Sequence, residues 1–185
     1  FSLAHRRTIA ENGVTFASHI NGARVEMTPE NVVDTQHILG PDVMMQLDIC
    51  APADATREEF AEAMETSVRW AVQSRDEWDA KDRISVQGHS QALFGIQQGG
   101  IHQDLRRESA ERLVELDLPG YAVGGLAIGE GHEVMCNVLD DIDELLPQNK
   151  PRYLMGVGEP RDILAAVARG IDMFDCVMPT RNARN

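Results

Sequence analysis

The chain has 185 residues, of which 43% are hydrophobic and 25% are charged, and its formal net charge is −13. This composition is ordinary for one folded domain with a sizeable core, and it excludes a disordered chain. The negative charge excludes general affinity for nucleic acid, because a phosphate binder usually shows a basic footprint. Any contact with RNA must therefore use a local basic patch or residues outside this sequence.

The N-terminal third predicts one strand and one helix. Val14–Ile20 reads as a strand that ends in a turn at Asn21-Gly22. A helix over 29–39 is expected, because Thr28 is a good N-cap, a proline follows it at the first helical position, and Gly40 supplies a stop. The next apolar run, Val43–Leu47, predicts a short buried strand that delivers Asp48.

A long amphipathic helix is predicted next. Thr56 and Glu59 have the spacing of a capping box. Apolar residues follow at helical spacing, namely Phe60, Met64, Val68 and Ala71. We interpret Trp70 and Trp78 as packing residues, because isolated aromatic residues on periodic helices usually pack. The polar stretch Lys81–Ser90 is predicted to be a surface loop.

The C-terminal half alternates short apolar runs with helical stretches. The predicted strands are Leu93–Ile96, Tyr121–Val123, Tyr153–Met155 and Met173–Phe174. The helices expected between them run from Asp104 to Leu116, from the glycine-rich stretch to about Leu146, and from Pro160 to Gly170. Repeated strand–helix units predict parallel strands with right-handed crossovers.

Two architectures fit this alternation, a doubly wound sheet and a (β/α)8 TIM barrel. Asp48, Gln98, Gly125 and Asp175 each come directly after a different strand. A barrel brings the carboxyl ends of its strands to one mouth, whereas an open sheet strings them along an edge. We therefore predict an α/β fold. A full barrel takes ~250 residues, so we expect residues 1–185 to form a single domain that is an incomplete TIM barrel, truncated at both ends.

Asp175 and Asp48 are the candidate reactive and binding carboxylates. Asp175 could form an ion pair with Arg181 or Arg184, or it could act as a nucleophile toward the oxocarbenium-like C1′ of a nucleoside. Asp48 could cap the turn at Ala51-Pro52, or it could accept two hydrogen bonds from the N1–H and amino group of a guanine-like base. The residue types alone leave both pairs of alternatives open.

Amide and glycine positions supply the remaining candidates. Of the two amides Gln97 and Gln98, at least one should point into the mouth and could donate to a purine O6; the alternative is a structural tie between loops. The run 124–130 is glycine-rich but does not match a dinucleotide-binding fingerprint. Backbone amides at 156–162 stand at a helix N-terminus, which favours either a phosphate site or a tight turn.

Metal and disulfide sites are not predicted within the sequence. Cys50, Cys136 and Cys176 are far apart and form no Cys-x-x-Cys pair, which indicates free thiols in a reducing cytoplasm. The six histidines show no ligand spacing. No apolar run approaches the ~20 residues that span a bilayer, and the first residues lack the order of a signal peptide. We expect both ends to be cuts through a longer protein.

Six segments together closely resemble the tRNA-guanine transglycosylase family, also called queuine tRNA-ribosyltransferases. Three are long and specific: Tyr121-Ala-Val-Gly-Gly-Leu-Ala-Ile-Gly-Glu, Tyr153-Leu-Met-Gly-Val-Gly, and the run from Met173 to Arg184. The others are 1–4, 13–16 and 93–99. The resemblance covers nearly the whole chain, with the loop 81–90 as its main variable part.

The resemblance implies a TIM barrel that replaces the wobble guanine of GUN-anticodon tRNAs (Asp, Asn, His, Tyr) by the 7-deazaguanine preQ1, in queuosine biosynthesis. Asp175 would attack C1′ to give a covalent ribosyl-enzyme, which the incoming base then opens with retention. Asp48 and Gln98 would read the purine edge, the backbone of Gly125 and Leu126 would contact O6 and the C7 substituent, and Met155 would flank the ring.

The resemblance also implies two RNA-contacting segments. They are Gly156, Val157, Gly158, Glu159, Pro160, Arg161 and Asp162, followed by Thr180, Arg181, Asn182, Ala183 and Arg184. Arg161, Arg181 and Arg184 would form the local basic patch that the net charge requires.

Two residues indicate the bacterial branch that uses preQ1. Cys50 follows Asp48 by two positions, and Ile128 is bulky where queuine-using enzymes tend to have glycine. Ile49 departs from the glutamate usual in bacterial members. The alternatives are a queuine-using enzyme, a non-catalytic partner subunit, and another barrel enzyme acting on a phosphorylated metabolite. The presence of Asp175 argues against the partner subunit.

Other family features should lie outside this sequence. In the family, a general acid/base aspartate precedes the position of Phe1, and a Cys3His zinc site follows that of Asn185. We therefore expect the chain alone to be inactive and to bind no metal through its own residues. The full-length protein is expected to be a cytoplasmic, zinc-binding homodimer that acts on tRNA without a membrane partner.

Overall fold

A sheet of five parallel strands organises the chain. The computed structural model describes residues 6–126, 129 and 131–184. The strands lie side by side in chain order: β4 (Val43–Met45), β5 (Ala92–Gln97), β6 (Gly120–Val123), β7 (Arg152–Leu154) and β8 (Met173–Phe174). Every neighbouring pair is parallel. A doubly wound sheet would reverse its strand order, whereas a barrel does not. The prediction of a partial (β/α) barrel is confirmed.

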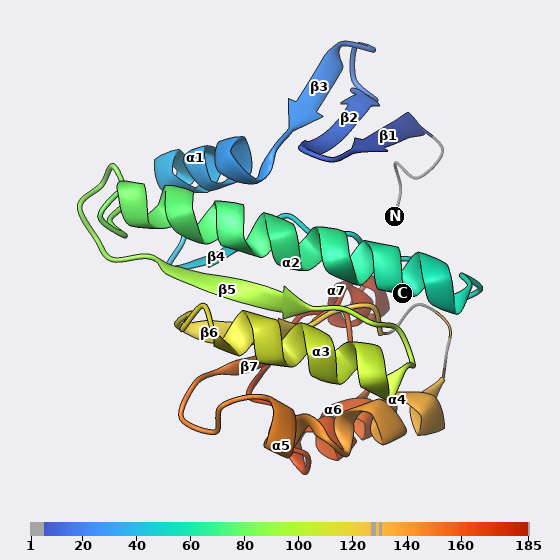
Figure 1. Cartoon of the computed structure of the whole chain (residues 1–185). Helices are drawn as coiled ribbons and strands as arrows, with labels where there is room; N and C mark the ends of the chain where they lie inside the picture. Colours follow the sequence, from blue (N-terminus) through green and yellow to red (C-terminus); the bar gives the residue numbers. More distant parts are fainter. Residues whose placement is uncertain (1–5, 127–128, 130, 185) are drawn as a thin grey trace.

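Helices make every connection within this sheet (Figure 1). They are α2 (Arg57–Ala80), α3 (Gln103–Val114), α4 (His132–Leu139), α5 (Ile142–Leu145) and α6 (Pro160–Val167), and α7 (Met178–Asn182) follows the last strand. The expectation of one helix ending near Leu146 is wrong. The chain breaks at Asp140 and Asp141, which favour helix ends over helix interiors, and Asp140 is held by Arg169 at 2.6 Å.

A small antiparallel sheet precedes the barrel strands. It consists of β1 (Arg7–Ala10), β2 (Gly13–Ala17) and β3 (Arg24–Met27), and α1 (Pro29–Leu39) follows it. Only β2 was predicted, and its expected end at Ile20 is wrong, because the chain turns where Gly22 N donates to Ser18 O at 2.9 Å. The strands β1 and β3 have four residues each and are mostly exposed. β1 carries no apolar alternation, and the alternation in β3, Arg24-Val-Glu-Met, is too short to predict a strand.

The predicted helix caps are confirmed. Thr28 and Thr56 each accept from the backbone N–H three residues on, and each side chain at that position bonds back, which completes two capping boxes. Gly40 ends α1 in the left-handed conformation, with φ of 71°. These caps set where α1 and α2 begin, and therefore where the strand β4 between them can lie.

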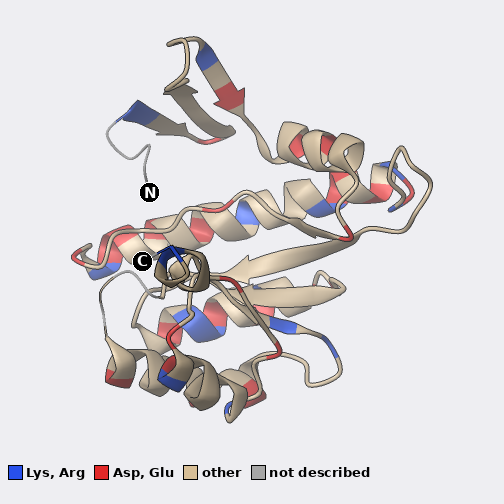
Figure 2. Cartoon of the chain, turned by 180° about the vertical axis from the view of Figure 1, so that it is seen from behind, with Lys and Arg blue, Asp and Glu red and all other residues tan. Residues whose placement is uncertain are grey.

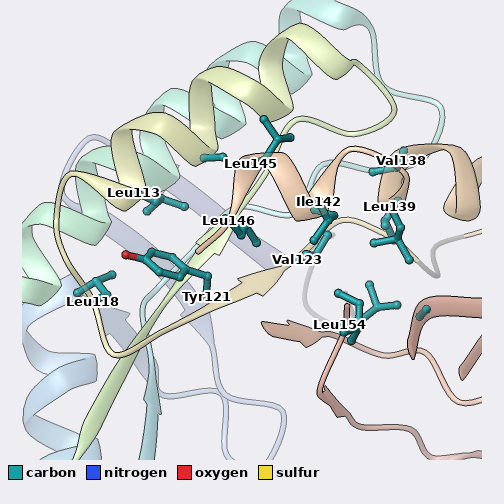
Figure 3. Packing of buried hydrophobic residues seen from close by; sticks show 14 of the residues in the cluster. Leu113, Leu118, Tyr121, Val123, Val138, Leu139, Ile142, Leu145, Leu146 and Leu154 are labelled. Carbon is teal, nitrogen blue, oxygen red and sulfur yellow. The ribbon is translucent and has the colours of Figure 1, made fainter. Parts of the chain in front are cut away.

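The main core lies between the sheet and the helices that cover it (Figure 3). Tyr121, Val123 and Leu154 of the strands pack there against Leu113 and Leu139 of the helices, and all five are buried. Burial of this apolar area anchors the carboxyl ends of the strands.

The two tryptophans of α2 are packing residues, as predicted. Trp70 and Trp78 are both buried. The indole of Trp70 donates to Glu11 O at 2.9 Å, which ties the antiparallel sheet to α2, and the indole of Trp78 donates to Gln91 O at 3.0 Å. Within the described residues no helix combines the length and apolarity needed to cross a membrane.

The capping box of α2 gives a test of the local folding argument. We expect Thr56→Ala to lower the free energy of unfolding by about 1 kcal/mol, because the Glu59 amide loses its partner, Thr56 Oγ1. Urea denaturation of the protein containing this chain measures the change. Thr35→Ala is the control, because that exposed hydroxyl bonds only within its own helix, to Asn31 O. Equal losses from both variants would contradict the capping argument.

Candidate active site

Five candidate residues stand at the carboxyl end of the parallel sheet. Asp48, Gln98, Gly125, Met155 and Asp175 each follow a different strand, from β4 through β8, within three residues of its end. Because the strands are parallel and in order, these residues share one end of the sheet. In Figure 1 the arrowhead of β5 points to that end, where α7 also lies.

Asp48 and Gln98 are in direct contact. Gln98 Nε2 donates to Asp48 Oδ2 at 2.7 Å, and the Gln98 side chain is buried. Gln97, in contrast, is buried on the other side of the strand and donates to Arg106 O at 2.9 Å, which is the structural role left open for one of the two amides. Among the described residues no hydrogen bond joins the Asp48 side chain to the turn at 51–52. The contact therefore favours a joint binding role for Asp48 and Gln98.

Burial disfavours the ionised form of the Asp48 carboxyl. Its surroundings raise the pKa of the Asp48 carboxyl above the ordinary value, because burial penalises the ionised form, and the hydrogen bond from Gln98 only partly offsets this. An ionised carboxylate there is short of donors. A ligand that offers two N–H groups would supply them.

The two glycines after β6 leave room for the Gln98 side chain. A Cβ atom on Gly124 would lie 2.7 Å from Gln98 Nε2, and one on Gly125 would lie 2.7 Å from Gln98 Oε1. Gly125 also has a φ of 69°, which L-residues rarely adopt. The predicted close approach of the backbone at Gly125 is thus an approach to Gln98, and the next residue, Leu126, is buried.

Asp175 is exposed and is held from one side. Its Oδ1 accepts from the Tyr153 hydroxyl at 2.6 Å and from Gly156 N at 2.7 Å. Among the described residues it forms no ion pair, so pairing with Arg181 or Arg184, one of the two alternatives, is not the arrangement found. The carboxylate is fixed through Oδ1, and Oδ2 has no hydrogen-bond partner in the described part of the chain.

Tyr153 is a hydroxyl donor at neutral pH. Burial and the neighbouring Asp175 raise the pKa of Tyr153 far above its ordinary value, so the phenol stays protonated. Tyr153 and Met155 are two residues apart on β7 and its extension, which places both side chains on one face of the strand. That spacing was the signal by which Tyr153, absent from our candidates, could have been found.

A cavity of about 300 Å³ lies beside Asp175. Residues of 156–162 line it together with Cys176 and Met178, which precede the second segment that the resemblance assigned to RNA, 180–184. His132 Nδ1 bonds Asp162 Oδ1 at its wall, and the same carboxylate oxygen lies 3.4 Å from Arg161 Nε. Asp162 therefore orients other side chains, and His132 is a wall residue that sequence reasoning missed.

The arginines near the site are exposed. Arg161 has a side chain that is 67% exposed, and Thr180–Arg184 are exposed on and after α7. Figure 2 shows blue on this helix close to the C-terminus, in front of the strands. The arginines expected to form a local basic patch are thus accessible, and Arg161 also pairs with Glu159 at 3.3 Å.

Arg106 is a further residue that the sequence did not reveal. It lies fully buried in α3, where its guanidinium donates to Gly100 O at 2.8 Å and to Gln97 O at 3.1 Å. It thereby fixes the loop after Gln98. An arginine in a charged, periodic helix reads as a solvent-facing residue, so no pattern marks it as buried.

Some expectations fall outside what the structure tests. Ile128, the proposed specificity position, and the segment 1–4 lie outside the described residues. The described residues contain no group of three or more histidine, cysteine or acidic side chains that could hold a metal ion.

Comparisons with known proteins identify the family of the chain. The family model described as "TGT: Queuine tRNA-ribosyltransferase" matches residues 1–185. A queuine tRNA-ribosyltransferase from Rickettsia bellii (strain OSU 85-389) is 52% identical over 184 residues, covering 100% of this chain and 49% of the relative. One from Stenotrophomonas maltophilia (strain K279a) is 55% identical over 185 residues, covering 100% and 48%.

The chain thus spans about half the length of the curated relatives it matches, and the resemblance seen in its motifs extends over all of it. The chain belongs to the queuine tRNA-ribosyltransferase family.

Proposed function

We propose that the protein containing this chain is a tRNA-guanine(34) transglycosylase that exchanges the wobble guanine of GUN-anticodon tRNAs for preQ1 by double displacement. The observation that carries the proposal is the shared end of one parallel sheet, with the Asp48–Gln98 pair on its first two strands and Asp175 on its last. The name of the relatives, queuine tRNA-ribosyltransferase, supports the proposal.

Base recognition rests on Asp48 and Gln98. Guanine and preQ1 share an N1–H and an exocyclic amino group, and a carboxylate that lacks donors matches that pair. The Gln98 amide reaches the purine O6 edge beside it, and the backbone of Gly125 and Leu126 passes the ring on the neighbouring strand. Met155 flanks the ring. Because both bases present the same edge, the same residues bind the base that leaves and the base that arrives.

Asp175 supplies the nucleophile. Its Oδ2 attacks C1′ of nucleotide 34 while the C1′–N9 bond breaks, and the bonding electrons leave with guanine, which takes up a proton. N9 of the incoming base then attacks C1′, gives up its proton, and breaks the ester to Asp175, so two inversions give net retention. Tyr153 and Gly156 hold Oδ1, so that Oδ2 points at the substrate. The proton carrier is expected outside this chain.

The RNA is held by the segments 156–162 and 180–184. Wobble-base chemistry requires the nucleotide to leave the anticodon stack, and phosphate contacts on either side hold the backbone open. Arg161 is exposed at the cavity, and Arg181 and Arg184 are exposed on and after α7, which suits all three to that role.

The partner and cofactor assignments are part of the same proposal. A structural Zn2+ bound by residues outside this chain, a homodimer and a cytoplasmic location fit a bacterial enzyme of this class. A queuine-using enzyme differs only in the C7 substituent it accepts. A non-catalytic partner subunit is disfavoured by Asp175, which is both present and held by two donors.

The nucleophile assignment predicts a large loss on Asp175→Asn. Exchange of labelled guanine into tRNA should fall by about 10³-fold or more, as for removal of other covalent nucleophiles. Asp172→Asn is the control, because that side chain only accepts from Arg152 N and the amide oxygen can do the same. Equal incorporation by wild type and Asp175→Asn would end the assignment.

Asp48→Asn should separate binding from stability. The pKa of Asp48 is higher in the folded protein than in the unfolded chain, so its ionised form lowers the free energy of unfolding at pH values above that pKa. The loss disappears as the carboxyl becomes protonated at lower pH. Asparagine removes the cost and can still accept from Gln98, so the Tm at pH 7 should rise. The KM for guanine should rise about tenfold or more, because two charge-assisted hydrogen bonds weaken.

The control for this variant is Asp42→Asn, an exposed aspartate at the opposite end of β4. Thermal unfolding and guanine-exchange kinetics give the two readings. A fall in Tm with an unchanged KM would show that Asp48 holds the fold and does not read the base.

Arg181→Ala tests the RNA surface. Loss of one phosphate contact should weaken tRNA binding and reduce the slope of log K against log salt by about one. Filter binding at several salt concentrations measures both. Arg75→Ala removes the same charge from α2, where the arginine pairs with Asp76, and should leave the slope unchanged. An unchanged slope in Arg181→Ala would remove α7 from the RNA surface.

A further inference from the structure

Two successive strand–helix units contain the same hydrogen bond, from a backbone amide at the site to a buried serine of the following helix. In the first, Ser67 Oγ on α2 accepts from Ile49 N at 2.9 Å. In the second, Ser109 Oγ on α3 accepts from Gln98 N at 3.1 Å. Both serines are fully buried. In each unit the helix that follows the strand thus bonds a backbone amide at, or directly after, a residue of the candidate base site.

The amides need these hydroxyls because the sheet no longer pairs them. Pairing of β4 with β5 ends at Met45 and Phe94, and pairing of β5 with β6 ends at Gln97 and Val123. One more backbone bond follows each pairing, from Gln46 N to Phe94 O at 3.3 Å and from Gly124 N to Gln97 O at 3.0 Å, and among the described residues none joins these strands further toward the site. A buried N–H without a partner costs about 1–3 kcal/mol, so the backbone takes a defined course there only if side chains replace the missing ladder.

Gln46 continues the same replacement. It is buried, its Oε1 accepts from Ile96 N at 2.9 Å, and its Nε2 donates to Ser67 O at 2.8 Å. One side chain therefore joins β4, β5 and α2 directly beneath the base site. The backbone of Ser67 is held by this bond while its hydroxyl holds Ile49.

The two serine bonds act on the torsions that aim the binding side chains. The peptide unit that carries Ile49 N–H also contains the carbonyl carbon of Asp48, so the Ser67 bond fixes ψ of Asp48. The Ser109 bond fixes the peptide unit before the Cα of Gln98, and therefore φ of Gln98. A Cβ position is set by these torsions, and the 2.7 Å contact between Asp48 and Gln98 requires both to be correct.

We propose that Ser67 and Ser109 are positioning residues that set the direction of the Asp48 and Gln98 side chains for purine binding. The inference rests on the proposed function, because it treats Asp48 and Gln98 as the groups that read the base. A serine suits the task, since its hydroxyl sits on a single rotatable bond from a helix already fixed in the core, which leaves little freedom at the site.

Ser74 shows that burial alone does not demand such a bond. It lies on α2 seven residues after Ser67 and is also fully buried, yet its hydroxyl has no hydrogen-bond partner among the described residues. Ser74→Ala therefore makes the same chemical change, in the same helix and at the same depth, without removing a partner from any site amide. It is the matched control.

The test compares Ser67→Ala, Ser109→Ala and Ser74→Ala in the protein containing this chain, by guanine-exchange kinetics. We expect the KM for guanine to rise about tenfold in the first two variants, because a misdirected side chain should lose about the free energy of one hydrogen bond to the base. The KM for tRNA should stay within twofold of wild type in all three. Ser74→Ala should match wild type for both substrates. A merely structural role would instead lower kcat or affect both substrates alike.

A double-mutant cycle tests whether Ser109 acts through Gln98. In a Gln98→Ala background, Ser109→Ala should add no further rise in the guanine KM, because the side chain it aims is gone. An undiminished tenfold effect would overturn the inference for Ser109. Hydrogen exchange at the Gln98 amide gives a reading independent of activity: protection should fall in Ser109→Ala and persist in Ser74→Ala.

The remaining outcomes separate the two levels of the argument. Wild-type protein that neither binds nor exchanges guanine would overturn the proposed function, and this inference with it. If wild type exchanges guanine and the Ser67→Ala and Ser109→Ala variants exchange it as well as Ser74→Ala, the inference alone is overturned. Should Ser67→Ala fail to fold, the Ser109 variant and its cycle still decide the question.

Discussion

The hydrogen bond between Gln98 and Asp48 is the contact on which the candidate site depends. It joins the ends of two neighbouring strands beyond the last point at which the sheet pairs them, and it places an amide and a carboxylate side by side. The glycines after β6 leave space for that amide, and Arg106 fixes the loop behind it. The apolar core below holds the strands themselves, so the polar groups of the site are arranged on a scaffold that is already rigid.

Much of this fold follows from local chemistry that the sequence displays. Thr28, Gly40 and Thr56 bound their helices where the cap preferences placed them, and the apolar runs before Asp48, Gln98, Gly125 and Asp175 are strands. The strands β1 and β3 escaped prediction because each has only four residues and is mostly exposed, so its pattern is too short to indicate a strand. The break between α4 and α5 was missed because apolar periodicity continues across the two aspartates.

The site was predictable as a set of positions but not as a set of contacts. Polar residues directly after apolar strands mark a barrel mouth, which is why Asp48, Gln98 and Asp175 could be named. The groups that hold them, Tyr153 and Arg106, look like ordinary strand and helix residues, because a hydrogen bond between distant segments leaves no pattern in either. Composition alone also conceals where the charges lie. The chain has a net charge of −13, yet exposed arginines stand on and after α7.

The close fit between the glycine pair and Gln98 has a consequence for how this sequence can drift. A Cβ atom at position 124 would lie 2.7 Å from both Gln98 Nε2 and Ile96 Cγ2, and one at position 125 would lie 2.7 Å from Gln98 Oε1. At position 125 the φ of 69° also disfavours any L-residue, whatever side chain stands at position 98. A shorter residue 98 would therefore relieve only part of the constraint, so both positions should remain glycine among descendants of this gene even where residue 98 varies.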